Sequence, residues 1–256
     1  MGLELESEPY HKTAAAQVMI EVKRQQHGDV AALYDAQRAG GFIDEWLADP
    51  PGPIASHRLV GGRGAVELVA PLGEPWVVRH YRRGGLMARW LKDSYVWRGA
   101  ERTRCFREFR LLVELADAGL PVAAPVAARY RRHGLIYRAD LVTAELPQAR
   151  TVAEYVLAGE FDAGLARAVG ATIAQFHRVG VWHADLNAHN ILQSGHRLYL
   201  IDFDRGRRRA PDQRWQVANL QRLRRSLLKL GGAEGQPAGW DTLWSALQDG
   251  YVREMP

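Results

Sequence analysis

The chain has 256 residues, 47% of them hydrophobic and 25% charged, with a net charge of +5 at pH 7. This composition can bury a sizeable core, which excludes a disordered chain and leaves one large domain or two small lobes. A single cysteine, Cys105, excludes an intrachain disulfide framework. Since the sequence has no secretory-signal pattern and no apolar run of about 18 residues, we expect a cytoplasmic protein.

Positive charge is concentrated in two segments. Residues 79–110 contain ten Lys or Arg against three acidic residues, and residues 205–229 contain nine against one. Such segregation favours an anionic partner: nucleic acid, anionic lipid or a polyphosphate substrate. The sequence has no zinc-ligand spacing, no RNA-binding sheet motif and no basic repeat with interleaved aromatic residues, so nucleic acid is the least favoured.

The first half of the chain is typical of a small sheet with one helix. Residues 1–58 contain strand or helix pieces ending at a Pro/Gly cluster, and we interpret them as an N-terminal extension that packs on a small lobe. Two β-prone runs then flank Gly61-Gly62-Arg63-Gly64, and a third covers 75–81. Residues 86–125 look helical, with apolar residues at helical spacing before Gly119 and Pro121. Two more β-prone runs, 124–132 and 133–146, complete an antiparallel sheet.

After Pro147 the pattern becomes mainly helical. Amphipathic helices are predicted over 151–159 and 161–180, followed by a loop, two short strands at 190–193 and 197–202, and two final helical segments. The sequence therefore predicts an α+β, bilobal protein. Its small lobe covers 59–146, and a connection near 143–148 leads to a mainly helical lobe, 147–256.

The loop after the second helix carries a set of polar residues with one chemistry in common. Phosphoryl transfer needs a group that orients the attacking hydroxyl and hard oxygen ligands for Mg²⁺. Asp185 suits the first task as catalytic base, and Asn190 and Asp202 suit the second as metal ligands. His183 is expected to be buried beside the loop and to hold its backbone. Each residue type alone is common in turns or cores, but together they predict a phosphoryl-transfer centre.

These motifs resemble those of the protein-kinase-like superfamily. His183-Ala-Asp185 with Asn190 looks like the His-Arg-Asp…Asn catalytic loop, and Asp202-Phe203-Asp204 looks like Asp-Phe-Gly. The resemblance implies a bilobal kinase fold with ATP and Mg²⁺ as cofactors. It also implies these nucleotide-binding residues: Gly61, Gly62, Arg63 and Gly64 as the phosphate loop, Arg79 with its partner Glu108, and Glu145 and Leu146 beside adenine. Arg79 departs from the pattern, because such kinases carry Lys there.

A narrower resemblance concerns the substrate. Residues 203–215 contain no Ala-Pro-Glu and no Ser, Thr or Tyr, which disfavours a regulated protein kinase. Residues 80–97, 101–147 and 202–227 together resemble the bacterial lipopolysaccharide kinases, in particular those acting on 3-deoxy-D-manno-octulosonic acid (Kdo). This implies ATP-dependent phosphorylation of the Kdo 4-hydroxyl on a Kdo–lipid A precursor. It also implies a peripheral protein on the cytoplasmic face of the inner membrane.

The basic residues nearest these motifs are candidates for binding the lipid's phosphates: Arg82, Arg83, Arg205, Arg207 and Arg208. Three alternatives stay open: a heptose kinase of the lipopolysaccharide core, a small atypical protein kinase, and an anionic-membrane or RNA-binding module with a decayed kinase fold. Arg79 in place of Lys favours decay, whereas the intact trio of Asp185, Asn190 and Asp202 opposes it. Asp204 in place of glycine predicts a site that is kept permanently assembled. The sequence leaves the oligomeric state open.

Overall fold

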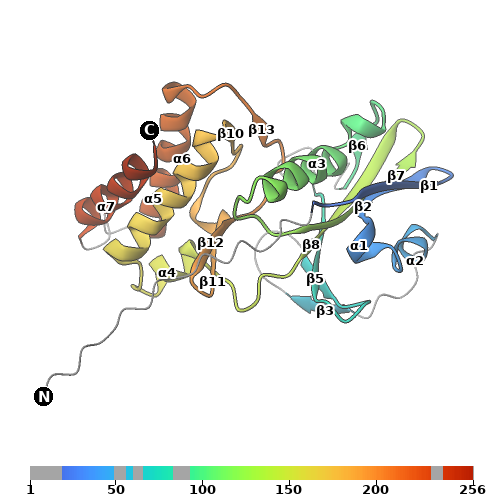
Figure 1. Ribbon diagram of the computed structural model, residues 1–256, viewed down its shortest axis with the longest axis horizontal. Coiled ribbons are helices and arrows are strands. Elements are labelled where there is room, and N and C mark those ends of the chain that lie inside the picture. The colour runs from blue at the N-terminus through green and yellow to red at the C-terminus, as the bar shows by residue number, and fades with distance from the viewer. Residues whose placement is uncertain (1–18, 49–55, 60–65, 83–92, 232–238, 256) are drawn as a thin grey trace, which may run out of the picture.

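The computed structural model describes residues 19–48, 56–59, 66–82, 93–231 and 239–255. A strand-rich part and a helical part lie side by side (Figure 1). The strands of the first part are β1 (Val22–His27), β2 (Val30–Asp35), β3 (Ser56–Leu59), β4 (Val66–Val69), β5 (Trp76–His80), β6 (Tyr95–Val96), β7 (Pro125–His133) and β8 (Ile136–Ala144). The predicted phosphate loop, Gly61 to Gly64, and the predicted lipid-binding Arg83 lie outside the described residues.

All these strands belong to one antiparallel sheet. Seven follow the order β1-β2-β7-β8-β5-β4-β3, and β6 pairs with β8. The long β7–β8 hairpin forms the centre, and β5 lies beside β8 in a register that sets Arg79 opposite Leu141. The sheet predicted from the β-prone runs is therefore confirmed.

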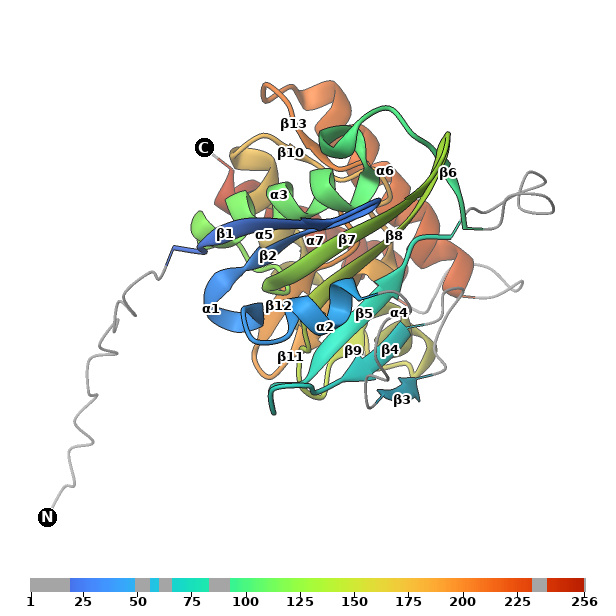
Figure 2. The ribbon, with the colours of Figure 1, turned by 90° about the vertical axis from the view of Figure 1, so that its right-hand side faces the viewer.

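The described part of residues 1–58 differs from the expected extension, because β1 and β2 are strands of the sheet itself. Every residue of β2 is buried. A strand buried on both faces lacks the apolar–polar alternation by which strands are recognised, which explains why the sequence did not indicate it. Helices α1 (Ala36–Ala39) and α2 (Ile43–Leu47) follow and cover one face of the sheet (Figure 2).

Helix α3 (Arg104–Asp117) covers the opposite face, between the sheet and the helical part (Figure 1). Of the segment 86–125 predicted as helical, only this part and the short 3-10 turn η2 (Ala100–Arg102) are helical among the described residues. Tyr95 and Val96 instead form β6, because pairing with Tyr137 and Ile136 of β8 suits aromatic and β-branched side chains. The helix ends before Gly119, whose φ of +73° is in the left-handed region that glycine adopts without strain.

The second part is mainly helical, as predicted. Its elements are β9 (Arg150–Thr151), α4 (Val152–Leu157), α5 (Ala163–Arg178), β10 (Val181–Trp182), the 3-10 turn η3 (Ala188–Asn190), β11 (Ile191–Ser194), β12 (Arg197–Leu200), β13 (Arg207–Arg208), α6 (Gln213–Leu230) and α7 (Trp240–Glu254). Helices α5 and α7 approach closely at two glycines. A Cβ on Gly170 would lie 1.9 Å from the Leu247 carbonyl oxygen, and one on Gly250 would lie 2.0 Å from that of Arg167.

The two parts share one core, which includes Phe109 and Leu112 of α3 together with Phe176 of α5 and Leu200 of β12. The Leu200 N–H also donates to the Pro121 carbonyl oxygen across 3.0 Å. The α+β, bilobal architecture is confirmed. A lobe boundary at 146/147 stays a prediction, and the sheet strands β1 and β2 lie before the predicted start of the small lobe at residue 59.

Candidate active site

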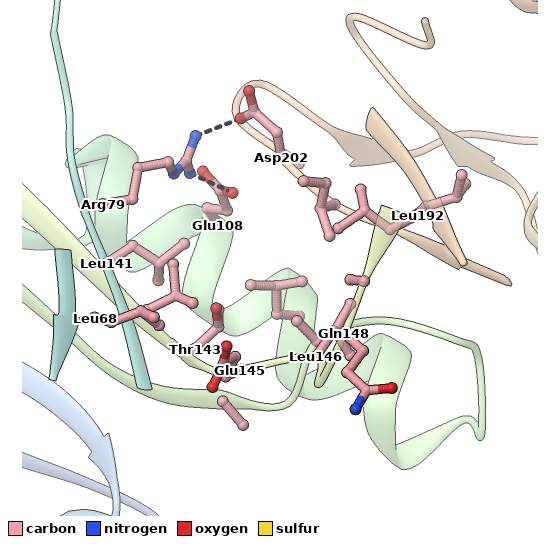
Figure 3. A pocket seen from close by; sticks show the side chains of 17 residues that line it. Leu68, Arg79, Glu108, Leu141, Thr143, Glu145, Leu146, Gln148, Leu192 and Asp202 are labelled. Atoms are coloured by element: carbon pink, nitrogen blue, oxygen red, sulfur yellow. Dashed lines mark hydrogen bonds and ion pairs between the residues drawn. The ribbon is translucent and has the colours of Figure 1, made fainter. Parts of the chain in front are cut away.

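A cavity of about 410 Å³ lies between the sheet and the helical part (Figure 3). Its walls are largely apolar, with Leu68, Val77 and Leu141 on the sheet side and Leu192, Leu200 and Ile201 on the other. The connection from Thr143 to Gln148 borders one end, and Arg79, Glu108 and Asp202 border the other. The predicted residues Glu145 and Leu146 line this cavity. Its size is in the range of clefts that bind small ligands.

Arg79 on β5 connects three segments that are far apart in the sequence. Its Nη2 donates to Glu108 Oε1 of α3 across 2.6 Å, and its Nη1 pairs with Asp202 Oδ1. Its guanidinium carbon also lies 4.7 Å from the centre of the Tyr81 ring. The predicted pairing of Arg79 with Glu108 is confirmed, and Asp202 is a second partner that the sequence did not indicate.

The cluster is held together by charge, and its Glu108 carboxylate is almost fully buried. Glu108 is 3% exposed, and it also accepts a hydrogen bond from the Tyr81 hydroxyl across 2.5 Å. Burial alone would lower the pKa of Arg79, but the Glu108 and Asp202 carboxylates outweigh it and raise that pKa above its ordinary value. Arg79 therefore stays charged. A buried carboxylate needs such a partner, because an unpaired charge in the interior is costly.

Asp202 follows β12 with a backbone φ of +61°, which is uncommon for a residue other than glycine. Behind it, Phe203 is buried, stacked at 5.7 Å on Phe176 and 4.9 Å from the His183 ring. This packing fixes the segment while the left-handed turn directs the Asp202 carboxylate towards Arg79. Backbone strain of this kind persists where the surroundings enforce it, commonly at functional sites.

His183 is buried beside the loop, in the position predicted for it. Its Nδ1 accepts a hydrogen bond from the Asp185 N–H across 3.1 Å, so its Nε2 carries the proton and donates to the Ile201 carbonyl oxygen across 2.9 Å. Burial lowers the pKa of His183, which keeps the ring neutral. The ring thus joins the backbone at Asp185 to the residue that precedes Asp202.

Asp185 points its carboxylate towards solvent, with 61% of its side chain exposed. Its Oδ1 accepts a hydrogen bond from Arg222 Nη1 of α6, and its Oδ2 accepts one from Asn187 Nδ2, each across 3.1 Å. Both oxygens are therefore oriented while the group stays accessible. These are properties that a base for a hydroxyl substrate requires.

The donor set at Asn190 and Asp202 fits a magnesium ion. Asn190 Nδ2 donates to the Asp185 carbonyl oxygen across 2.9 Å, which leaves its amide oxygen as the free end of the side chain. The Ile201 N–H donates to the Asn190 carbonyl oxygen across 3.1 Å, so the backbones at Asn190 and Asp202 are adjacent. Amide and carboxylate oxygens are hard ligands of the kind Mg²⁺ prefers. Within the described ranges, no group of three or more His, Cys, Asp or Glu offers another metal site.

The predicted phosphate-binding arginines lie on both sides of the site. Arg82 is exposed just after Tyr81 in the sheet part, whereas Arg205, Arg207 and Arg208 are exposed just after Asp202. Arg207 lies 5.0 Å from the centre of the Trp182 ring, and Arg208 donates to the Val179 carbonyl oxygen across 2.9 Å. Three of these arginines therefore belong to the segment that follows Asp202, whereas Arg82 belongs to the sheet part.

Helix α6 contacts the loop from His183 to Asn190 through side chains that the sequence did not indicate. Buried Asn219 accepts from the His183 N–H across 3.3 Å and donates to the His183 carbonyl oxygen across 3.0 Å. Ser226 Oγ accepts from the Ala188 N–H across 3.1 Å. One signal was available for Asn219, since it interrupts the buried face formed by Trp215 and Leu223 of this helix. Tyr81 could also have been found, because it lies two residues from Arg79 and so on the same side of an extended chain.

Comparison with known proteins gives consistent matches. Residues 58–251 match the family model described as "Lipopolysaccharide kinase (Kdo/WaaP) family". A 3-deoxy-D-manno-octulosonic acid kinase of Xanthomonas campestris pv. campestris (strain B100) is 47% identical over 216 residues, covering 82% of this chain and 84% of the relative. That of Xylella fastidiosa (strain M23) is 43% identical over 213 residues, covering 80% and 83%.

Among solved structures, the chain resembles WaaP in its complex with acyl carrier protein. The TM-score is 0.51 at 19% sequence identity, and the match covers 78% of this chain and 79% of that one. At this identity the likeness shows the fold alone. It agrees with the two-part architecture derived above.

Proposed function

Because the chain belongs to the lipopolysaccharide kinase (Kdo/WaaP) family, we propose that it transfers the γ-phosphoryl group of ATP to the 4-hydroxyl of Kdo on a Kdo–lipid A precursor. The enzyme is a phosphotransferase that acts on a sugar hydroxyl in lipopolysaccharide core biosynthesis. The observation that most supports the assignment of the site is the bridge of Arg79 to Glu108 and Asp202 at one end of the cavity.

The nucleotide fits the cavity in one direction. Adenine lies between the apolar walls and bonds the backbone near Glu145 and Leu146, so the phosphates extend towards the opposite, charged end. There Arg79 steadies the α- and β-phosphates, while Glu108 fixes the orientation of its guanidinium. The Gly61 to Gly64 segment is assigned to cover the phosphates on the basis of its place in the sequence.

Asp185 acts as the base. It accepts the proton of the Kdo hydroxyl as a bond forms between that oxygen and the γ-phosphorus. The bond from the γ-phosphorus to the bridging oxygen breaks, and ADP leaves with the electron pair. Arg222 and Asn187 orient the carboxylate, and His183 holds the loop backbone. Asn190 and Asp202 would hold Mg²⁺, which supplies neutralising charge to the phosphates when bound.

The acceptor approaches from the side of the exposed arginines. Arg205, Arg207 and Arg208, with Arg82 and Arg83, bind the phosphates of the lipid A precursor and interact with anionic head groups, each at about 1 kcal/mol. We assign the enzyme to the cytoplasmic face of the inner membrane as a peripheral protein. None of the helices in the described ranges has the length and hydrophobicity that a membrane span requires.

The test is phosphate transfer from labelled ATP in the presence of Mg²⁺ to three separate acceptors: Kdo–lipid A precursor, a heptosylated acceptor and a generic protein. We expect label on the first acceptor only. Label on the heptosylated acceptor alone would establish a heptose kinase instead, and label on the protein alone would establish a protein kinase. Binding of anionic vesicles or RNA without any transfer would favour a module with a decayed site.

A further inference from the structure

One face of α6 contacts the catalytic loop at three successive points. Asn219, Arg222 and Ser226 are spaced so that they share a helix face, and they bond to His183, Asp185 and Ala188 in that order. The helix is thereby fixed in register along the loop. Asn219 and Ser226 bond to the loop backbone, whereas Arg222 alone bonds to the side chain of the base.

Arg222 also differs from its two neighbours in exposure. Asn219 is 3% exposed, whereas 47% of the Arg222 side chain is exposed. An exposed Arg–Asp pair contributes little to stability, and the backbone bonds of Asn219 and Ser226 already attach the helix to the loop. A guanidinium group carries five N–H donors. Within the described part of the chain, Arg222 uses one of its donors, on Asp185 Oδ1.

The remaining donors lie next to the group that activates the acceptor hydroxyl. We propose that Arg222 forms a carboxylate-binding subsite, which holds the acid group of the acceptor sugar and selects a sugar acid over a neutral sugar. This inference rests on the proposed function and names what the acceptor side recognises. A guanidinium fork matches a carboxylate through two parallel N–H···O bonds, and Asp185 orients that fork in the absence of substrate.

The distance between the carboxylate and the 4-hydroxyl of Kdo would allow Arg222 to bind the first group while Asp185 contacts the second. In Kdo the carboxyl carbon and the carbon bearing the 4-hydroxyl are separated by two carbons, so the two groups are on the order of 5 Å apart. Arg222 Nη1 lies 3.1 Å from Asp185 Oδ1. An acceptor whose carboxylate binds the outer donors of Arg222 therefore presents its 4-hydroxyl to Asp185. Heptose has no carboxylate and gains nothing from this contact.

The experiment compares two acceptors that differ only at this group: the Kdo acceptor and its carboxamide. Initial rates with saturating ATP and Mg²⁺ give kcat/KM for the wild type and for Arg222→Gln, Arg222→Lys and Arg167→Gln. Arg167 is the matched control, since it is an exposed helical arginine on α5, outside the cavity lining. The KM for ATP and the melting temperature of each variant are measured alongside.

We expect the wild type to prefer the carboxylate acceptor by about tenfold or more, the value of a hydrogen-bonded charge pair. Arg222→Gln should slow transfer to both acceptors, because Asp185 loses one of its orienting partners. On the carboxylate acceptor it should lose that additional factor as well, so the preference disappears. Arg222→Lys should keep part of it, because charge remains without the fork. The KM for ATP should not change, and Arg167→Gln should behave as wild type.

Two results would overturn the inference while leaving the proposed function intact. In one, the wild type phosphorylates Kdo with no preference for the carboxylate. In the other, Arg222→Gln loses the same factor on both acceptors and keeps the wild-type preference, which would mean that Arg222 acts only through Asp185 or on the transferred phosphate. If the wild type phosphorylates neither Kdo acceptor, the proposed function itself is wrong and the inference falls with it.

Discussion

Arg104 at the start of α3 donates a hydrogen bond from Nε to Asp204 Oδ1 across 2.7 Å, although the two residues are 100 positions apart. Both side chains are 20% exposed, and the guanidinium lies over the Tyr95 ring at 4.7 Å. The segment from Asp202 to Asp204 is thus attached to α3 at two points. Arg79 joins Asp202 to Glu108 of α3, and Arg104 of α3 binds Asp204 directly. Asp204 occupies the place of the glycine in Asp-Phe-Gly, and its pairing supports the prediction of a permanently assembled site.

Removing this link should loosen the segment that carries Asp202 against α3, because the Arg79 bridge is then the ion-pair link that remains between them. We expect Arg104→Gln and Asp204→Asn each to lower kcat by about tenfold or more through misplacement of Asp202, and to raise the Mg²⁺ concentration needed for half-maximal rate. The double variant should be no slower than either single variant, because both remove one interaction. Arg110→Gln, also on α3, breaks an exposed pair with Glu101 of the turn η2 and is the control. Additive losses in the double variant would show that the two residues act separately.

The ion pairs of Arg79 with Glu108 and Asp202 should contribute strongly to the free energy of unfolding. Arg79→Met leaves the Glu108 carboxylate buried without its cation, and loss of one partner of a buried pair costs about 3–5 kcal/mol. Urea unfolding at pH 7 measures this, with Arg167→Met as the matched exposed control. Arg79→Lys should unfold at a higher urea concentration than Arg79→Met but should raise the KM for ATP, since one ammonium cannot bridge Glu108 and Asp202 as the guanidinium does. Equal stability of Arg79→Met and Arg167→Met would contradict the account.

Asp185 should affect rate without affecting the fold. Its side chain is exposed and joined only to Arg222 and Asn187 within the described residues. Asp185→Asn should therefore melt close to wild type and bind ATP with similar affinity. Its kcat should fall by about 10²–10⁴-fold, as expected for loss of a general base. A folded Asp185→Asn protein with near-normal turnover would remove Asp185 from the mechanism.

A second ionic cluster in the sheet should give stability a pH dependence. Asp140 on β8 pairs with His80 on β5 and accepts two hydrogen bonds from Arg129 on β7, while Glu67 on β4 lies 3.9 Å from His80. The hydrogen bond to Asp140 raises the pKa of His80. Burial would raise the pKa of Asp140, but the bonds from His80 and Arg129 outweigh it and lower that pKa.

The directions of these two pKa shifts determine the pH range in which the cluster stabilises the folded state. The stabilisation from His80 is complete below its ordinary pKa of about 6.5 and is lost as pH rises through its raised pKa. The stabilisation from Asp140 is present above its ordinary pKa of about 3.9 and is lost as pH falls through its lowered pKa. The difference in unfolding free energy between wild type and His80→Gln should therefore be largest near pH 5 and shrink above pH 7. His133→Gln removes an exposed histidine at the end of β7 and serves as the control. A pH-independent difference between wild type and His80→Gln would contradict the prediction.

Asn219 should show how far α6 supports the catalytic loop. It bonds to both backbone groups of His183, and its Oδ1 lies 3.4 Å from His177 Nε2. Asn219→Ala leaves these buried groups unpaired, at a cost of about 1–3 kcal/mol, and should lower kcat more than it raises the KM for ATP. Chemical denaturation together with steady-state rates tests this. A variant with normal kcat despite reduced stability would show that the helix stabilises the fold without positioning the loop.

Much of this architecture could be predicted from the sequence, because it depends on the local spacing of apolar residues and on the order of polar ones. The helical spacing around Phe106 and Phe109 predicted α3, and the order of Asp185, Asn190 and Asp202 around a short hairpin predicted a phosphoryl-transfer centre. Two features were not predicted correctly from local pattern. Strand β2 is buried on both faces and lacks alternation, and Tyr95–Val96 is extended only because β8 lies beside it.

By itself, the sequence determined the class of chemistry, since a hydroxyl-orienting carboxylate and hard oxygen ligands can be recognised by residue type and order. It also indicated the Arg79–Glu108 pair. Only the tertiary structure decided that Asp202 also pairs with Arg79, that Arg104 pairs with Asp204, and that Arg222 pairs with Asp185. These contacts join residues between 37 and 123 positions apart. Packing of α3 and α6 against the loops brings them together, and no local pattern in the chain encodes that proximity.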